Sequence, residues 1–303
     1  MNLAHLHLLL NHFPTIGLGI ALGLHVAALL KQSEDLKQAS FVGFYLLGLV
    51  AIPAYLTGGA AQVVLQDQPG VSQDVMAAHQ DAALLALIVM EIMGFVAWAA
   101  LWRFKRWHEA GVLVLAAVTF GLMASAANIG GHIRHPEIMV DGAVEPVPGW
   151  PRTAAAGAAF VIDNPWVWPI CEVFHFVGLC LLFGVVLLVN LRLLGFVRGV
   201  ASADVNRLLP WAMAGLGINI VTGMLFFLAA PGQYTQNSAF VWKIALMLIA
   251  GVTLLYPTMW DHDRGGVPGD RAPLTGRIVA AGSICLWIGV IFLGRFLPYL
   301  GSE

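Results

Sequence analysis

Long apolar stretches, separated mostly by short polar connections, dominate the chain. A helix of about 20 apolar residues crosses the hydrocarbon core of a bilayer. Most connections are too short for a folded extramembrane domain, so any chemistry takes place within the bilayer or at its surface. The pattern predicts eight membrane-crossing helices, over residues 5–30, 41–65, 75–102, 109–131, 166–196, 208–230, 239–259 and 278–299.

One connection is much longer than the others and divides the chain in two. Residues 132–165 hold five prolines among small and polar residues, a composition typical of a loop between folded segments. The two halves share no residue pattern that would make them repeats. We therefore predict an all-α polytopic membrane protein of two four-helix bundles. Residues 1–138 form a histidine-rich bundle, 139–165 a periplasmic connection and 166–303 the second bundle.

Composition agrees with this fold class, and charge gives the orientation. The chain is 59% hydrophobic and 11% charged, and its net charge of -2 gives no indication of nucleic acid binding. Cations concentrate on alternate connections, which the positive-inside rule makes cytoplasmic. We expect a multi-pass protein in the lipid of a bacterial inner membrane, with both termini periplasmic and no cleavable signal peptide. These cations are Lys31, Lys37, Arg103, Lys105, Arg106, Arg192, Arg198, Arg207, Arg264, Arg271 and Arg277.

Histidine is the residue type that most suggests chemistry. Most of the 10 histidines lie in or beside apolar segments, where a polar side chain costs free energy and so indicates function. Neutral histidine is a common axial ligand of haem and a good ligand for copper or zinc. The chain has no C-x-x-C-H motif for covalent attachment, so any haem is b-type. The predicted topology brings five histidines to the periplasmic face: His7, His12, His79, His132 and His135.

His12 and His79 are the expected axial ligands of one haem. Each lies near the periplasmic start of a helix that runs inward, and inward side chains from facing helices build cofactor sites in bundles. The alternative is a hydrogen bond at the interface, to a carbonyl for His12 and to water or Asp81 for His79. Three further histidines, His7, His132 and His135, are expected to contact haem propionates, ligate a second metal or take protons from a quinol, the alternative being contact with water alone. Arg134 beside them is the expected partner of a propionate, because its guanidinium is a fixed bidentate donor.

A second, inner haem is the interpretation for His25. It lies about 20 Å further inward than His12 by helix rise, with Met93 or His108 as the opposite ligand. An ideal helix would not aim His12 and His25 the same way, and the alternative is a histidine at the cytoplasmic interface. Glu91 lies in apolar surroundings and is expected to be neutral or paired with a cation. It would belong to a proton route or hydrogen-bond to His25.

The second half carries one Glu-x-x-His pair. Glu172 and His175 share a helix face and can touch, which suits them to accept the two protons that a quinol releases on oxidation. Alternatively, His175 ligates a haem, with Met224 or Met247 opposite and Lys243 on a propionate. A di-iron site needs two such pairs with further glutamates, so it is not expected.

Two segments of the first half resemble a known family. Residues 6–14, LHLLLNHFP, are similar to the L-H-P-x-L-V-H-F-P opening of an uncharacterised family of four-helix bacterial membrane proteins. Residues 129–135 resemble the Gly-Gly-containing end of that family's fourth helix, and His79 matches a histidine of the family. Leu8 departs from the pattern, because the family has proline there. The resemblance implies a four-helix fold for about residues 4–138 and these histidines, without a settled activity.

The second half resembles the four-helix copper-resistance membrane modules. The likeness lies in residues 241–246, VWKIAL, and in the glycine-rich sixth helix. The methionine and histidine arrays that favour a copper relay are missing from this half.

Two functions are compatible with these patterns. The first is a membrane b-type cytochrome with one or two haems b, which transfers electrons between quinone or quinol and a periplasmic redox protein or a partner subunit. It is an enzyme if it oxidises quinol. The second is a permease for copper or another metal ion that uses the histidines as a pathway. A structural subunit would not need so many polar groups, and we expect electron transfer.

Overall fold

The computed structural model describes residues 3–66, 68, 71–134, 153–197, 199–201, 204–205, 207–259 and 272–300. Over these residues the chain forms helices and no strand, and eight helical spans are long and apolar enough to cross a membrane. The predicted all-α polytopic fold is confirmed. The spans are Leu3–Lys31, Glu34–Leu65, Gln73–Trp102, Trp107–Ile133, Val167–Leu194, Leu209–Ala229, Ser238–Met259 and Leu274–Leu297.

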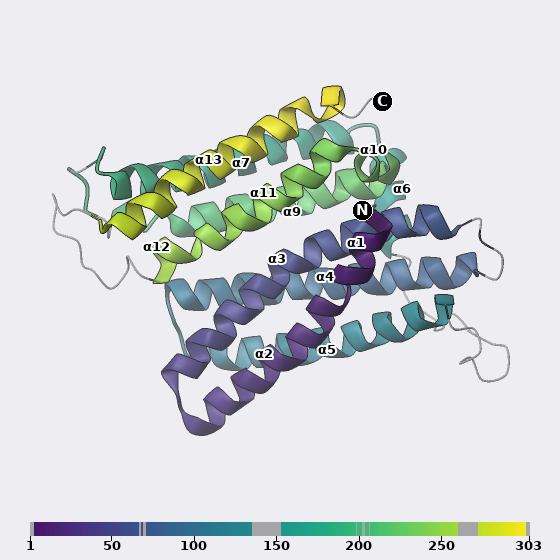
Figure 1. Cartoon of the computed structure of the whole chain (residues 1–303), viewed down its shortest axis with the longest axis horizontal. Helices are drawn as coiled ribbons and strands as arrows, with labels where there is room; N and C mark the ends of the chain where they lie inside the picture. Colours follow the sequence, from purple (N-terminus) through teal and green to yellow (C-terminus); the bar gives the residue numbers. More distant parts are fainter. Residues whose placement is uncertain are drawn as a thin grey trace. The chain divides into compact units, whose positions relative to one another are not determined.

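The chain divides into two compact units. Unit 1 comprises Met1–Ala159 and unit 2 comprises Phe160–Glu303. In unit 1, α2 (His12–Lys31) packs against α3 (Glu34–Leu65) and α5 (Trp107–Arg134), and α4 (Gln73–Trp102) also packs against both. These four helices form the bundle drawn in purple to blue in Figure 1. A short helix, α1 (Leu3–Leu10), precedes α2 and packs on α3.

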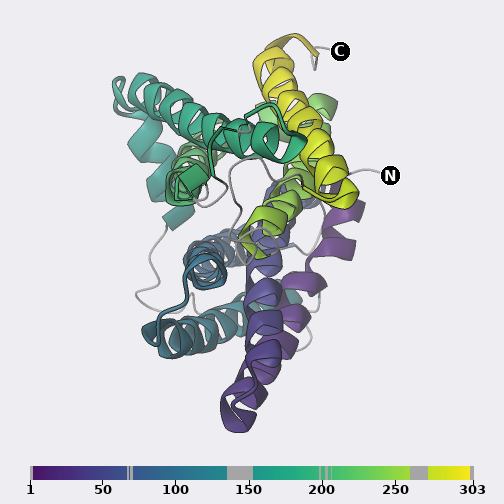
Figure 2. The same cartoon turned by 90° about the vertical axis from the view of Figure 1, so that its left-hand side faces the viewer.

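The first predicted helix is broken at Asn11. Residue Asn11 forms a turn between α1 and α2, and Pro14 in the first turn of α2 has no N–H to donate to the carbonyl of Leu10. Figures 1 and 2 show α1 as a separate short helix at the start of the chain. The break assigns His7 and His12 to different helices, which the sequence pattern did not anticipate.

Side-chain caps fix where several helices begin. Ser33 accepts a hydrogen bond from Leu36 N at the start of α3, and Ser72 accepts one from Val75 N at the start of α4. Asn237 Oδ1 accepts from Ala239 N at the start of α11. These bonds satisfy amide groups that have no partner within their helix. These three helices therefore each begin after a polar residue whose side chain caps a free amide group.

Unit 2 is also built around four long helices. They are α7 (Val167–Leu194), α9 (Leu209–Ala229), α11 (Ser238–Thr253) and α13 (Leu274–Leu300), with short α10 (Pro231–Thr235) and α12 (Leu255–Met259) at the two ends of α11. α7 packs against α9 and α13, and α11 packs against α13. Figure 2 shows α13, in yellow, crossing α7, in teal. Gly178 and Gly215 let α7 and α9 approach closely, because a Cβ on Gly215 would lie 2.5 Å from Gly178 O.

The long connection between the bundles contains a helix, where the sequence indicated only a loop. α6 spans Thr153–Ile162 and consists mainly of alanine and apolar residues, which favour helix. Asp81 of α4 holds its start, since Ala154 N donates to Asp81 Oδ1 at 2.8 Å. At 10 residues, α6 is too short to cross a bilayer.

Candidate functional site

His7 reaches from α1 into the side of α3. Its half-buried ring donates from Nδ1 to the carbonyl of Ala54 at 2.9 Å, and Thr57 Oγ1 lies 3.3 Å from the same nitrogen. A carbonyl only accepts hydrogen bonds, so Nδ1 carries the proton and Nε2 keeps a lone pair. Gly58 gives the ring room, because a Cβ there would lie 3.3 Å from His7 Cε1.

His79 is held in the same way between α4 and α5. Its half-buried ring donates from Nδ1 to the carbonyl of Ala126 at 2.9 Å. The lone pair is again on Nε2, and no described residue hydrogen-bonds to Nε2 of either ring. A Cβ on Gly130 would lie 2.9 Å from His79 Cε1, so this ring also occupies space that only glycine leaves.

The two histidines belong to matching helical hairpins within unit 1. His79, Ala126 and Gly130 each lie 72 positions after their counterparts His7, Ala54 and Gly58, and a second glycine follows in both cases. This spacing, a histidine followed 47 residues later by Ala-x-x-x-Gly-Gly, is visible in the sequence. Comparison of residues within the first half could therefore have identified His7 as the counterpart of His79.

The two rings also lie near each other. His7 is close enough to His79 to act on its ring electrostatically. Tyr55 and Gln80, the neighbours of Ala54 and His79 in the chain, lie against each other between α3 and α4. Two neutral imidazoles, each with a free Nε2 and an Nδ1 fixed by a backbone carbonyl, are the ligand set that haem iron takes in six-coordinate b-type centres.

The expected pairing of His12 with His79 stays a prediction, and among the described residues no hydrogen bond joins the two side chains. His12 is exposed at the first residue of α2. His132 lies on α5, and its Nδ1 is shielded from solvent without a hydrogen-bond partner in the described part of the chain. Arg134 ends α5, but its side chain lies outside the described part of the chain, as does the whole of His135.

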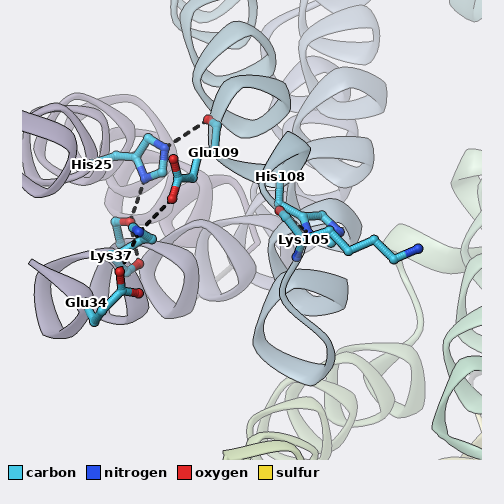
Figure 3. A network of polar contacts seen from close by, with 7 residues as sticks. His25, Glu34, Lys37, Lys105, His108 and Glu109 are labelled. Carbon is cyan, nitrogen blue, oxygen red and sulfur yellow. Dashed lines mark hydrogen bonds and ion pairs between the residues drawn. The ribbon is translucent and has the colours of Figure 1, made fainter. Parts of the chain in front are cut away.

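A separate polar network joins α2, α3 and α5 at the opposite end of unit 1 (Figure 3). His25, with no exposed surface, lies 2.8 Å from Ser40 Oγ through Nδ1 and donates from Nε2 to Glu109 O at 3.2 Å. Ser40 Oγ in turn donates to Lys37 O at 2.7 Å. Both ring nitrogens of His25 are therefore engaged, and neither presents a free lone pair to an inner haem.

Lys37 is the charged centre of this network. Its Nζ lies 2.6 Å from Glu109 Oε1 and 2.8 Å from Glu34 Oε1, and 5.1 Å from the centre of the Phe104 ring. The Lys37 side chain is 9% exposed, so this end of the bundle holds a cation that two carboxylates neutralise. Such pairing is what an ionised group at membrane depth requires. We interpret the network as a structural link between α2, α3 and α5.

The other residues considered for an inner haem either have a hydrogen-bond partner in the protein or are buried. His108 is buried and accepts a hydrogen bond at Nδ1 from Lys105 N at 2.9 Å. Met93 has no exposed surface. Glu91 does not hydrogen-bond to His25, whose partners are given above; its Oε1 is shielded from solvent and has no hydrogen-bond partner in the described part of the chain. Glu91 lies where Gly48 and Gly94 bring α3 and α4 together.

In unit 2, His175 and Glu172 have different partners. His175 Nδ1 lies 2.7 Å from Thr222 Oγ1 of α9, whereas Glu172 is exposed and its Oε1 accepts from Trp168 Nε1 at 3.1 Å. Within the described residues no hydrogen bond joins Glu172 to His175. The cation near the His175 ring is Lys243 of α11, which acts on it electrostatically. The expected Glu172–His175 pair is therefore replaced by His175 with Thr222 and Lys243.

The structure brings no larger set of metal ligands together. In the described ranges, no group of three or more His, Cys, Asp or Glu side chains could hold a metal ion. The candidate site is thus the pair formed by His7 and His79.

Residues 168–300, which lie in unit 2, match the model of a family of unknown function (DUF6644). No curated protein and no solved structure gives a significant match to the chain.

Proposed function

We propose that the protein is a membrane b-type cytochrome, which transfers electrons between quinone or quinol and a periplasmic redox protein or partner subunit. The observation that supports it most strongly is the matched geometry of His7 and His79. Both rings are fixed through Nδ1 to backbone carbonyls of neighbouring helices, and no described residue bonds to Nε2 of either ring. Histidine ligands of metals are commonly oriented in this way by a hydrogen bond from the second ring nitrogen.

Several residues of unit 1 would hold a haem, each through a different contact. His7 and His79 would supply the axial nitrogens, and His132, with its shielded Nδ1, is available to a propionate. Arg134, at the end of the same helix, remains a candidate for the second propionate. Bound haem would supply a one-electron ferric–ferrous couple. Backbone carbonyls hold both ligands in the neutral form that iron requires, and no nearby charge is needed for that purpose.

The location of the pair agrees with exchange at the periplasmic face. Residue His7 lies near the N-terminus, and His79 lies in the second turn of α4. The positive-inside rule assigns both of these helix starts to the periplasmic side, since the cations lie at the other end. A soluble redox protein or a partner subunit at that face is the expected electron partner.

The test is a visible spectrum of the purified protein with three histidine variants. We expect a Soret band and an α band that change on reduction with dithionite. His7→Ala and His79→Ala should each abolish one haem per protein, because each removes an axial ligand. His12→Ala, an exposed neighbour on α2, is the matched control and should keep the wild-type spectrum.

Two results would reject this function. One is a purified wild-type protein, reconstituted with haemin, that shows no haem band. The other is an unchanged haem content in both His7→Ala and His79→Ala. Metal analysis of the same samples would then test the metal-ion permease as the remaining alternative.

A further inference from the structure

A threonine of α9, Thr222, fixes which ring nitrogen of His175 carries the proton. Thr222 donates its hydroxyl proton to the carbonyl of Ile218 at 2.7 Å, so the Thr222 oxygen accepts a hydrogen bond from His175 Nδ1 at 2.7 Å. With the proton on Nδ1, the lone pair of the ring is on Nε2. Nε2 can therefore accept a proton from a ligand, as a general base does.

Lys243 brings a cation near enough to this base to act on it electrostatically. Its side chain is half-buried and runs along Gly294 of α13, where a Cβ would lie 3.5 Å from both Cε and Nζ. No carboxylate or carbonyl in the described part of unit 2 bonds to Nζ. An ammonium group inside an apolar helix bundle is costly without a partner, so its position indicates a ligand that accepts its hydrogen bonds.

Aromatic rings complete the surroundings of the pair. The ring centre of Phe226, on α9, lies 5.8 Å from that of His175 and 4.7 Å from that of Trp168. The site thus offers one neutral acceptor, one cationic donor and a flat apolar surface. A hydroxyl group can bond to both the acceptor and the donor, and an aromatic ring can pack on the apolar surface. The three features therefore favour an aromatic ligand with a hydroxyl group.

We propose that unit 2 binds the headgroup of a membrane hydroquinone between His175 and Lys243, a proposal that rests on the electron-transfer function given above. One phenolic hydroxyl satisfies both side chains, because its proton is donated to His175 Nε2 while its oxygen accepts from Lys243 Nζ. A carbonyl has no proton for Nε2, and an ionised carboxylate has none either. The ring of the headgroup packs beside Phe226, and the apolar tail remains in the bilayer.

The same two groups can assist oxidation. A hydroquinone that becomes a quinone loses two protons and two electrons. Each proton passes through Nε2 of His175 and then to water, while Nζ of Lys243 stabilises the negative charge that develops on oxygen. The two electrons would leave singly for a one-electron acceptor, which under the proposed function is the ferric–ferrous couple that bound haem would supply, so one hydroquinone would need two such oxidising equivalents. The quinone product no longer donates to Nε2, which favours its release.

The experiment uses the full-length protein in detergent with decylubiquinol as the probe. Binding is measured by equilibrium dialysis and haem reduction by stopped-flow spectroscopy. Lys243→Met should weaken decylubiquinol binding at least about tenfold, a loss of about 1.4 kcal/mol, whereas Lys243→Arg should retain most of it. His175→Gln should slow reduction by about 10²–10⁴ and leave the haem spectrum unchanged.

Thr222 supplies a matched pair of positioning variants. Thr222→Val removes the hydroxyl that orients the His175 ring and should slow haem reduction, while Thr222→Ser keeps the hydroxyl and should restore the wild-type rate. Trp242→Phe, at an exposed neighbour of Lys243, controls for general damage to α11.

Wild-type binding and reduction rates in both Lys243→Met and His175→Gln would overturn the proposal. Loss of a haem band in His175→Gln would also overturn it, because His175 would then be an axial ligand. A wild-type protein without haem would reject the electron-transfer function alone. In that case decylubiquinol binding that depends on Lys243 still supports the site, and binding that does not depend on it rejects the site.

Discussion

A glycine four residues after the acceptor carbonyl allows each histidine of the candidate site to reach the backbone of a neighbouring helix. Gly58 and Gly130 leave the space that the rings of His7 and His79 fill. A Cβ would lie 3.3 Å from Cε1 of His7 at position 58 and 2.9 Å from Cε1 of His79 at position 130, so a side chain at either position would crowd the ring. The two glycines are therefore part of the site, although they offer no functional group of their own.

Gly130→Ala is expected to displace the ring of His79 and to lower the haem content of the protein to less than about half. The added Cβ would lie 2.9 Å from Cε1, a distance at which the ring must move. Gly121→Ala, on the same helix with nothing within 4 Å of its Cβ, is the control and should keep full haem content. The pyridine haemochrome assay measures both. Equal haem content in the two variants would contradict the assigned geometry of His79.

The sequence predicts His12 as the partner of His79, and this pairing stays a prediction; the structure places His7 near enough to His79 to act on its ring electrostatically. A continuous helix from residue 5 was assumed, and on such a helix the depth of His12 matches that of His79. The structure instead has a turn at Asn11, just before Pro14, and α1 packs on α3 through contacts that hydrophobic periodicity does not encode. Likewise, His175 bonds to Thr222 rather than to Glu172. The two residues lie 47 positions apart in the chain, so the spacing of residues within one helix does not reveal this contact.

At the scale of helices, the polar network centred on Lys37 joins α3 to α5, and its contribution to stability can be measured. Glu109 on α5 and Glu34 on α3 bond to the same ammonium group, at 2.6 and 2.8 Å. Their side chains differ in exposure, at 30% for Glu109 and 79% for Glu34. Water screens the more exposed pair more strongly, so the two carboxylates contribute differently to stability.

Glu109→Gln should lower the free energy of unfolding by about 1–2 kcal/mol, because a partly buried charge-assisted hydrogen bond between two helices is weakened. Glu34→Gln should change it by less than about 0.5 kcal/mol, as is usual for an exposed pair within one helix. Thermal unfolding in detergent, followed by circular dichroism, compares the two variants. Equal shifts in melting temperature would show that the link between α3 and α5 does not depend on this pair.

The spans themselves followed closely from the sequence, since the bilayer fixes the length of an apolar helix and charged residues mark its ends. Residues 75–102 were expected as a helix, and the structure gives Gln73–Trp102. Polar caps such as Ser72 account for the difference of two residues. α6 was missed because an alanine-rich run of 10 residues carries too weak a pattern to separate from a loop.

At the scale of the whole molecule, the cations on alternate connections predict how the protein is oriented in the membrane. Lys31 ends α2, Arg103 follows α4, Arg192 lies in the last turn of α7 and Arg277 in the first turns of α13. Two spans separate each of these residues from the next, so all four are expected on the same side of the membrane. The positive-inside rule therefore predicts that all four face the cytoplasm and that both termini face the periplasm.

A reporter fused after Glu303 tests this orientation. Alkaline phosphatase, which folds only in the periplasm, should be active at that position, while the same enzyme inserted at Gln32, between α2 and α3, should be inactive. Green fluorescent protein should give the opposite pattern at the two positions. Eight spans connect the ends of the chain, so activity at Gln32 together with inactivity at Glu303 would invert the topology. The histidine pair would then lie at the cytoplasmic face, and the electron partner would have to be a cytoplasmic protein.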